Sequence, residues 1–228
     1  MPNLDSEKLI AAVKAVEEVC DGMLVGLGTG STAAYAVTSL SNRIRNGLRI
    51  TAVATSKATE ILARRLGVPL IPFQSLSAVD LTIDGADEID CYFRAIKGGG
   101  GALLREKVVA AASHRVIVIA DSTKFVTQLG KFPLPVEVVP FATDFVRARL
   151  GALGAKVTLR ALDGKPFLTD QDNHILDAAL DTIPKPIETA AAIAAIPGVV
   201  EHGLFLDEID TMMIARGDTV EVLHRWQV

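Results

Sequence analysis

Short runs of valine, isoleucine and leucine alternate with helical segments through the first half of this chain, and this alternation constrains its fold more than any other feature. Apolar runs occupy residues 23–28, 50–54, 79–83 and 116–120. Helical patterns occupy residues 9–20, the stretch that starts at residue 31, and residues 57–66. Continuous apolar strands separated by helices are typical of a parallel sheet covered on both faces. We therefore predict a doubly wound, Rossmann-like α/β domain.

The pattern changes after residue 130. Strands are expected at residues 136–139, 156–160, 167–169, 174–178 and 199–206, with helices at 142–153 and 187–196. This β-α-β-β-α-β order, with one extra short strand, is close to the ferredoxin-like unit. A last buried strand at 211–215 is expected to return to the first sheet. We therefore predict a Rossmann-like domain of residues 1–131 plus 207–228, with a smaller α+β domain of residues 132–206 inserted in it.

Composition narrows the functional class. Of the 228 residues, 50% are apolar and 22% are charged, as in a soluble globular protein. The net charge of −4 and the lack of a long basic run argue against nucleic acid as a partner. Two cysteines without a C-x-x-C pair suit a reducing compartment. The acidic N-terminal segment and the absence of an apolar run of about 18 residues predict neither a signal peptide nor a membrane span. We expect a cytoplasmic protein, and an enzyme.

The first candidate site is the segment Gly26-Leu27-Gly28-Thr29-Gly30-Ser31-Thr32, which follows an expected strand and begins a helix. Free backbone N–H groups and the helix dipole make such a turn a cradle for anions. Ser31 stands where a dinucleotide fingerprint needs its third glycine, and no Gly-Lys-Ser/Thr follows as in a P-loop. A small phosphate ester therefore fits better than a dinucleotide. A tight turn with a helix cap is the structural alternative.

The second candidate is Asp84-Gly85-Ala86-Asp87-Glu88-Ile89-Asp90, directly after another expected strand. Four carboxylates this close repel one another unless a cation or a proton lies among them. A divalent metal is one answer, but the spacing does not match a calcium loop and no histidine is near. Hydroxyl recognition with proton transfer is the other answer. A solvated acidic loop without chemistry is the structural alternative.

The third candidate is Lys97-Gly98-Gly99-Gly100-Gly101, which precedes a helix that carries Glu106 near its start. Four consecutive glycines cost chain entropy, so we expect unusual backbone torsions or a close approach to a ligand. The alternative is a plain flexible linker. Two lysines complete the candidates: Lys124, which follows an expected strand, and Lys8, whose place early in a helix a bound anion would explain. The histidines show no metal-ligand spacing, and Ser31 lies in no nucleophile elbow.

Taken in order, these motifs resemble the type A ribose-5-phosphate isomerases. The resemblance rests on Gly28–Thr32, Asp84–Glu88, Lys97–Gly101 with Arg105–Lys107, and Gly130–Val138, and it extends through Ile196–Val200 and Gly203–Phe205. It covers nearly the whole chain. Two departures stand out: Thr55-Ser56-Lys57 replaces a serine-rich segment, and Cys91-Tyr92-Phe93-Arg94 is unusual before Lys97.

The resemblance implies interconversion of ribose 5-phosphate and ribulose 5-phosphate in the pentose phosphate pathway, without metal or cofactor. By position it makes Glu106 the base that moves a proton between C1 and C2 through an enediolate. It gives Asp84, Asp87 and Lys97 the tasks of ring opening, hydroxyl proton transfer and oxyanion stabilisation. It also implies a homodimer or homotetramer. The substrate-binding residues that it implies are Lys8, Thr29, Gly30, Ser31, Thr32, Gly85, Ala86, Gly98, Gly99, Gly100 and Lys124.

Two other functions fit part of the pattern. A coenzyme A transferase shares this general fold and also uses a glutamate, but as a covalent nucleophile. A phosphosugar-binding module without catalysis is the second, although such a module in a transcription regulator would need a DNA-binding segment, and the sequence shows no helix-turn-helix or basic patch. Trapping of a glutamyl thioester and a test for turnover discriminate these alternatives.

Overall fold

The structure, a computed structural model, describes residues 3–225 and divides the chain into two compact units. Unit 1 comprises Met1–Ala86, Arg105–Phe125 and Asp207–Val228, of which residues 1–2 and 226–228 lie outside the described part. Unit 2 comprises Asp87–Leu104 and Val126–Leu206. The first domain was expected to extend to residue 131, whereas residues 87–104 and 126–131 group with unit 2. Short strands within 87–104 pair with a strand of unit 2, which accounts for this grouping.

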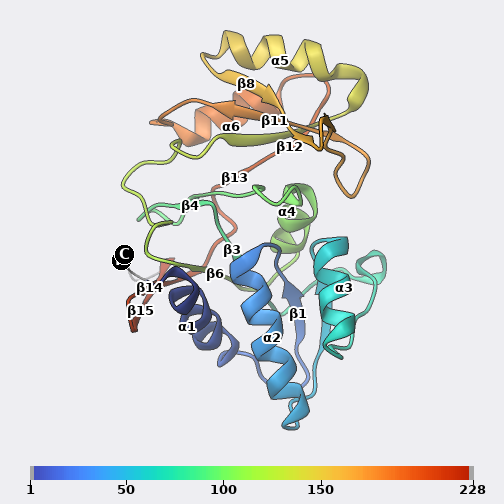
Figure 1. Cartoon of the computed structure of the whole chain (residues 1–228), viewed down its shortest axis with the longest axis vertical. Helices are drawn as coiled ribbons and strands as arrows, with labels where there is room; N and C mark the ends of the chain where they lie inside the picture. The colour runs from blue at the N-terminus through green and yellow to red at the C-terminus, as the bar shows by residue number, and fades with distance from the viewer. Residues whose placement is uncertain (1–2, 226–228) are drawn as a thin grey trace. The chain divides into compact units, whose positions relative to one another are not determined.

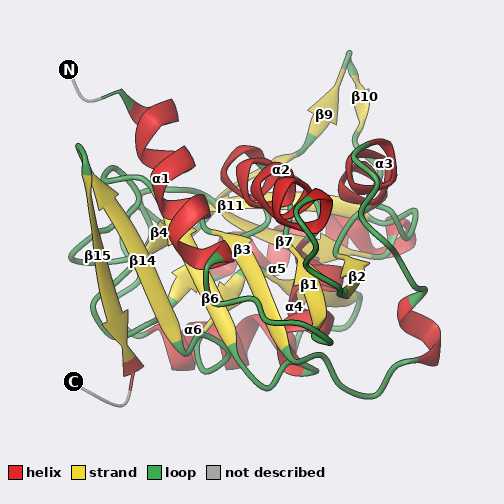
Figure 2. Cartoon of the chain, turned by 90° about the horizontal axis from the view of Figure 1, so that it is seen from below, coloured by secondary structure: helices red, strands yellow, loops and turns green. Residues whose placement is uncertain are grey.

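Unit 1 is built on a six-stranded sheet that confirms the predicted α/β class (Figure 2). Four of its five strand pairings are parallel, and only the pairing of the last two strands of the chain is antiparallel. The expected return of the segment near residue 211 to this sheet is confirmed. The final hairpin strand was not predicted. In lateral order the strands are β15 (Thr219–His224), β14 (Thr211–Arg216), β6 (Val116–Ala120), β3 (Leu81–Gly85), β1 (Leu24–Leu27) and β2 (Thr51–Ala54).

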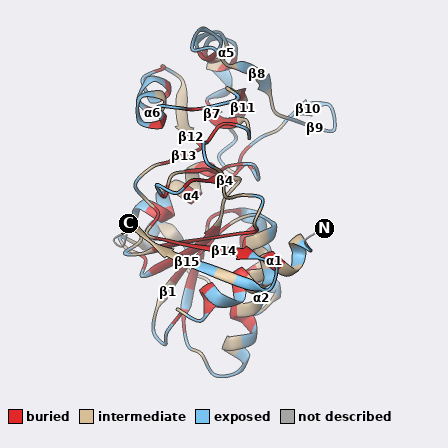
Figure 3. Cartoon of the chain, turned by 90° about the vertical axis from the view of Figure 1, so that its left-hand side faces the viewer, coloured by how far each residue is buried: buried red, intermediate tan, exposed pale blue. Residues whose placement is uncertain are grey.

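Successive residues of the strands point to opposite faces of this sheet, and each face is covered. Val25 and Ala52 belong to the core beneath the first helices, whereas Val53 packs with Val109 on the other face. The strands β1, β3, β6 and β14 are the most buried part of unit 1, whereas the edge strand β15 is not buried (Figure 3). The helices of unit 1 are α1 (Leu4–Val16), α2 (Ser31–Arg45), α3 (Lys57–Arg65) and α4 (Leu103–Ala111), whose first two residues belong to unit 2, and a short 3₁₀ helix spans Phe73–Ser75.

The strand order reverses between β1 and β3. From β1 the chain moves outward to β2, then returns to β3 on the other side of β1 and continues to β6. In open α/β sheets, ligands bind outside the carboxyl ends of the strands at such a switch point. We therefore expect a ligand site at the loops that follow β1, β3 and β6.

Unit 2 contains a four-stranded antiparallel sheet and two helices (Figure 1). Numbered along the chain, its strands lie in the lateral order 4-1-3-2, with the helices after the first and third, as in the ferredoxin-like fold. The predicted class of the smaller domain is thus confirmed. These elements are β7 (Leu134–Val138), α5 (Thr143–Ala152), β8 (Lys156–Leu159), β11 (His174–Ala179), α6 (Pro186–Ala194) and β12 (Val199–His202), with a 3₁₀ helix at Pro140–Ala142.

Two details of unit 2 differ from the prediction. The segment 167–169 is not a strand, because Thr169 and Asn173 close a turn in which the Thr169 N–H donates to the Asn173 carbonyl at 2.9 Å. The expected strand 199–206 is divided, and its second part joins a separate sheet. This separate sheet contains β13 (Leu204–Phe205), β5 (Ala95–Ile96) and β4 (Glu88–Ile89), and a further small sheet contains β9 (Ala161–Leu162) and β10 (Lys165–Pro166).

Within residues 3–225, no helix is both long and apolar enough to cross a bilayer.

Candidate active site

The turn after β1 passes unusually close to the end of β3. A Cβ atom on Gly28 would lie 2.1 Å from Oδ1 of Asp84 and 2.5 Å from its Cα, so only glycine fits. Asp84 is 2% exposed, and its Oδ1 accepts the N–H of Thr29 at 3.0 Å and that of Gly85 at 2.7 Å. Asp84 is therefore fixed at the point where the strand order reverses.

The same turn leads into an uncapped helix. Gly30 is the N-cap of α2 with φ +100°, and no side chain bonds to the helix end. The first N–H groups of a helix, here those of Ser31, Thr32 and Ala33, have no partner within the helix. The first turn also carries no acidic residue. These features favour an anion at the start of α2, as predicted from the glycine pattern.

Thr29 uses its hydroxyl inside the protein. Its Oγ1 lies 2.8 Å from Oγ1 of Thr55, 2.9 Å from Oγ of Ser56 and 3.3 Å from Oγ1 of Thr59. Thr55 and Ser56 belong to the segment in which the sequence departs from the resemblance. This departure therefore touches the candidate site, because the two residues anchor the turn that begins α2.

Glu106 lies in the first turn of α4 and is 4% exposed. The direction of this helix follows from its far end, where the carbonyl of Ala112 accepts the N–H of Val79 at 2.9 Å, just before β3 begins. Its last turn is thus at the amino edge of the sheet, and its first turn is at the carboxyl edge. Glu106 therefore lies at the edge that carries Asp84 and the start of α2.

The N-terminal turn of α1 is tied to the same edge by Glu7. This side chain is 1% exposed; its Oε2 accepts the N–H of Ser122, and its Oε1 accepts that of Gly217, both at 2.8 Å. Burial on its own would raise the pKa of Glu7, but these two backbone donors, together with the Ser122 side chain and the charge of Arg216, outweigh it and lower the pKa. Ser122 lies in the loop after β6, so Glu7 holds the start of α1 against that loop.

The two candidate phosphate ligands flank this contact. Lys8 follows Glu7 in α1, where its Nζ lies 3.4 Å from a carboxylate oxygen of the exposed Asp5. Lys124 lies in the loop after β6. Its backbone N–H donates to the carbonyl of Asp121 at 3.1 Å and so closes a turn of this loop. The predicted residues of unit 1 thus gather at one edge of its sheet.

The other predicted residues lie in unit 2, which the chain enters after Ala86. Lys97 is 4% exposed, its N–H donates to the carbonyl of Gly203 at 2.8 Å, and its Nζ lies 5.3 Å from the ring centre of Phe205. Asp87 accepts the N–H of Gly99 on Oδ2 at 2.8 Å. The turn after β5 therefore positions both a cation and a carboxylate.

The glycines of this turn are required by the space around them. Gly98 and Gly101 have φ of +101° and +79°. A Cβ on Gly99 would lie 2.5 Å from Oδ1 of Asp87, and one on Gly101 would lie 2.5 Å from the ring of Phe167. Gly100 is exposed. The run is thus a shaped loop and not a flexible linker.

The remaining carboxylates of the acidic segment are structural. Glu88 accepts the N–H of Gly130 at 2.7 Å and that of Phe132 at 2.6 Å. Asp90, fully buried, pairs with Arg94 at 2.6 Å. These donors explain how four carboxylates lie so close in sequence. Among residues 3–225, no group of three or more His, Cys, Asp or Glu side chains is arranged to hold a metal ion.

Three residues that support the site, Glu7, Arg160 and Asp177, were not predicted from the sequence. Glu7 shares a helix face with the buried Ala11 and Ala15, so a carboxylate within an apolar stripe was the available signal. Arg160 and Asp177 gave no such signal, because they are 17 positions apart and meet only through the sheet of unit 2.

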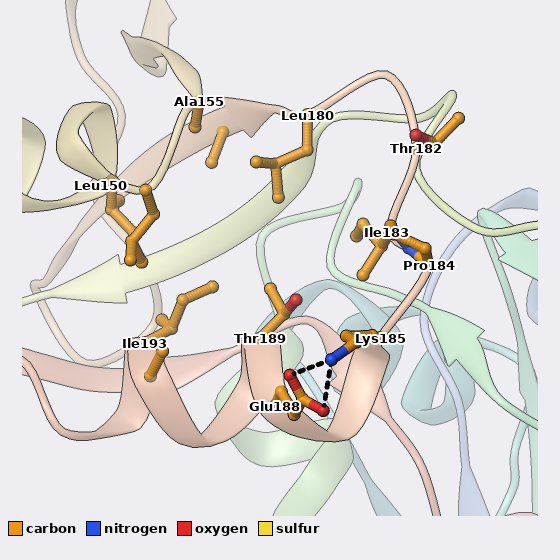
Figure 4. Close-up of a pocket in the computed structure, with 13 residues that line it drawn as sticks. Leu150, Ala155, Leu180, Thr182, Ile183, Pro184, Lys185, Glu188, Thr189 and Ile193 are labelled. Atoms are coloured by element: carbon orange, nitrogen blue, oxygen red, sulfur yellow. Dashed lines mark hydrogen bonds and ion pairs between the residues drawn. The ribbon is translucent and has the colours of Figure 1, made fainter.

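An apolar cavity of about 320 Å³ lies in unit 2 between α5, β11 and α6 (Figure 4). Lys185 and Glu188 also line this cavity and form an ion pair, in which Nζ of Lys185 lies 3.0 Å from Oε1 of Glu188. Its apolar lining includes Leu150, Leu180, Ile183 and Ile193. None of the residues predicted to act on a substrate lines this cavity.

With this geometry established, comparison with known proteins is informative. The family described as ribose 5-phosphate isomerase A (phosphoriboisomerase A) matches residues 51–219. A ribose-5-phosphate isomerase A of Sphingopyxis alaskensis is 78% identical over 99% of this chain and 99% of its own length.

The chain belongs to the ribose 5-phosphate isomerase A family.

Other members of the family agree. The Cereibacter sphaeroides ribose-5-phosphate isomerase A is 51% identical over 94% of this chain and 89% of its own length. The structure of the Methanocaldococcus jannaschii ribose 5-phosphate isomerase A has a TM-score of 0.91 and 39% identity, and covers 95% of this chain and 97% of that one. A D-ribose-5-phosphate isomerase in complex with phospho-erythronic acid has a TM-score of 0.94 and 35% identity, and covers 98% of this chain and 100% of that one.

Proposed function

We propose that this protein interconverts D-ribose 5-phosphate and D-ribulose 5-phosphate by proton transfer through an enediolate, with Glu106 as the base. The observation that carries the proposal is the placement of a buried carboxylate and an anion-binding helix start at one edge of the sheet of unit 1. Membership of the isomerase family supports the reaction. It disfavours a coenzyme A transferase and a non-catalytic phosphosugar-binding module.

The phosphate of the substrate binds at the start of α2. The N–H groups of Ser31 and Thr32 and the dipole of a 15-residue helix face this position, and Lys8 and Lys124 supply positive charge at the same edge. Gly30, Gly85 and Ala86 give the backbone room to approach the sugar. Binding energy gained at the remote phosphate orients the reacting carbons.

The chemical step needs one base. The Glu106 carboxylate takes the proton from C2 of the open-chain aldose, and the electron pair of that C–H bond forms the C1–C2 double bond while O1 becomes an oxyanion. A proton then leaves O2 and one is gained at O1. The same carboxyl group returns its proton to C1 as the carbonyl forms at C2, so the reaction is redox-neutral overall.

Asp84, Asp87 and Lys97 assist this step. Opening of the furanose ring requires a proton to leave the anomeric hydroxyl and another to reach the ring oxygen, which suits two carboxyl groups. The ammonium of Lys97 stabilises the developing oxyanion, and the backbone of Gly98, Gly99 and Gly100 lines the substrate. Asp84 is in unit 1 and Asp87 in unit 2.

The direct test is to incubate the purified protein with ribose 5-phosphate, without nicotinamide or added metal, and to measure ketose. We expect ribulose 5-phosphate to accumulate to an equilibrium mixture. Binding of ribose 5-phosphate without ketose would instead support the phosphosugar-binding module. A glutamyl thioester trapped by hydroxylamine in the presence of an acyl-coenzyme A would support the transferase.

We also propose a homodimer or homotetramer in the cytoplasm. Exposed aromatic side chains support self-association: Phe141 is fully exposed, and Phe145 of α5 is 52% exposed. Sedimentation of the purified protein tests the assembly, and fractionation of cells that express it tests the location.

A further inference from the structure

Arg160 and Asp177 form a largely buried ion pair beside the glycine loop of unit 2, which we define as residues 98–101. Their side chains are 15% and 23% exposed. Arg160 Nε lies 3.0 Å from Oδ2 of Asp177, and Nη2 donates to Oδ1, so the contact is bidentate. This geometry fixes the plane of the guanidinium and leaves Nη1 directed away from Asp177.

Nη1 of Arg160 bonds to the backbone of the glycine loop. It donates to the carbonyl of Gly98 at 2.8 Å and to that of Gly99 at 3.1 Å. The Gly98 carbonyl also accepts the N–H of Gly101 at 2.9 Å, which closes the turn. Two successive peptide units are therefore held by one side chain.

The peptide between Gly98 and Gly99 connects Arg160 to a proposed catalytic residue. In a planar trans peptide, the C=O and the following N–H point in opposite directions. Here the carbonyl is held by Arg160, and the N–H of Gly99 donates to Oδ2 of Asp87 at 2.8 Å. Any rotation of this peptide moves the donor to Asp87, so the orientation of Asp87 depends on Arg160.

Within the glycine loop Gly98 and Gly101 are buried, whereas Gly99 and Gly100 are exposed. Glycine has no side chain to pack and loses more conformational freedom on ordering than any other residue. On the side of Arg160, the loop borders a cavity of about 520 Å³ that Gly99, Arg160 and Asp177 help to line. Gly99 is exposed, so the orientation of the peptide units on either side of it depends on their hydrogen bonds to Arg160 and Asp87.

We infer that Arg160, held by Asp177, is a positioning residue for the isomerase reaction, which orients Asp87 through the Gly98–Gly99 peptide. This inference rests on the proposed function, because it requires Asp87 to act on the substrate. The effect belongs to the chemical step. The phosphate is proposed to bind in unit 1, so substrate affinity should change little.

The test compares kcat and KM of Arg160→Gln, Arg160→Lys and Asp177→Asn with those of the wild type. A lysine ammonium is a single donor centre and cannot hold both Asp177 and two carbonyls. We expect kcat to fall about 10- to 100-fold in both Arg160 variants, the size that a misplacement of about 1 Å produces, with KM within threefold. Asp177→Asn should lie between these variants and the wild type, because an amide oxygen still accepts from Arg160.

Hydrogen exchange of the amides of residues 97–104, measured without substrate, gives a readout that does not depend on activity. It should be faster in the Arg160 variants than in the wild type. Glu188→Gln, which removes an exposed ion pair of the same unit, is the control and should change neither kcat nor this exchange. If Arg160→Gln does not fold, Arg160→Lys and Asp177→Asn carry the same test.

Two outcomes would overturn the inference: a kcat within twofold of the wild type in folded Arg160 variants, or a loss that appears in KM with unchanged exchange of the loop. An inactive wild type would instead refute the proposed function. The loop-exchange measurement would then still show whether Arg160 orders the glycine loop.

Discussion

At the scale of single residues, two buried glutamates have pKa values that their surroundings shift in opposite directions. Glu7 receives backbone donors on both oxygens, and its pKa is lowered although burial alone would raise it. Glu137 of β7 is fully buried; its Oε1 accepts from Thr169 and Asn173, and its Oε2 has no hydrogen-bond partner among the described residues. Burial raises the pKa of Glu137 despite those two bonds.

The raised pKa of Glu137 predicts a pH-dependent gain from Glu137→Gln. A carboxyl whose pKa is raised on folding stabilises the fold below its unfolded pKa, near 4.5, and this contribution is lost as the pH rises through the folded pKa. Glutamine stays neutral, so we expect the variant to melt about 2–4 °C above the wild type at pH 8, which corresponds to roughly 1 kcal/mol in unfolding free energy. At pH 4 it should not melt above the wild type. Thermal melting across this range checks it. The exposed Glu188→Gln should follow the wild type, and equal melting of Glu137→Gln and wild type at every pH would contradict the prediction.

The acidic segment shows how much residue-scale chemistry could be predicted. Its sequence indicated that four neighbouring carboxylates need stabilising partners, but it did not identify those partners. The partners of Glu88 are the N–H groups of Gly130 and Phe132, more than 40 positions away, and that distance hides them from local patterns. Asp84 and Asp87 could be selected only through the family resemblance.

At the scale of elements, no side chain bonds to the start of α2, where we propose that the phosphate binds. We expect Ser31→Asp or Thr32→Asp to raise KM for ribose 5-phosphate about tenfold or more, or roughly 1.4 kcal/mol, because a carboxylate repels the phosphate. Folding should tolerate the change, since helix starts favour acidic residues. Ser31→Asn is the matched control for Ser31→Asp, because asparagine has nearly the same shape as aspartate but carries no charge. Wild-type KM in both aspartate variants would place the phosphate elsewhere.

The packing of β1 against β3 gives a second prediction at this scale. Gly28→Ala places a Cβ 2.5 Å from the backbone of Asp84, so we expect a loss of about 1–3 kcal/mol in unfolding free energy, together with lower activity. Gly151→Ala, in the last turn of α5, meets nothing within 4 Å and should be neutral or stabilising by up to about 1 kcal/mol. Chemical denaturation of both variants is the measurement. Equal stability of the two would contradict the close approach.

Elements could be predicted where one chemical pattern dominated. The buried strands β1, β3 and β6 are continuous apolar runs, and α2 begins at a glycine turn, so local sequence was sufficient. The edge strand β15 and the two-residue strands β4 and β5 were missed, and β13 was predicted only as the end of a longer strand, because pairing with distant partners defines them. Residues 167–169 looked like a strand, but their turn depends on Asn173 and Glu137.

At the scale of the whole molecule, the proposed catalytic groups are distributed over both units. The chain leaves unit 1 after Ala86 and returns at Arg105, so Asp84 and Glu106 lie in unit 1, and Asp87 and Lys97 in unit 2. The alternation of strands and helices predicted both folds. It could not predict that the segment 87–104 groups with the inserted unit, because that assignment depends on pairing between β5 and β13.

We also expect the whole enzyme to work without metal or nicotinamide. The carboxylates of the acidic segment are satisfied by backbone N–H groups and Arg94, and Ser31 interrupts a dinucleotide fingerprint. Turnover should therefore survive exhaustive chelation and dialysis. Loss of ketose formation in chelator, with recovery on addition of magnesium or zinc, would contradict this expectation.

The most direct test of the account is the kcat of Glu106→Gln. Glutamine keeps the shape of the side chain but cannot accept the proton from C2, so we predict a fall in kcat on the order of 10²–10⁴ with phosphosugar binding largely intact. Thermal stability should barely change, and Glu60→Gln, an exposed glutamate of α3, should leave kcat at the wild-type value. A Glu106→Gln enzyme with kcat within threefold of wild type, about 0.7 kcal/mol in the barrier, would remove Glu106 from the role of base.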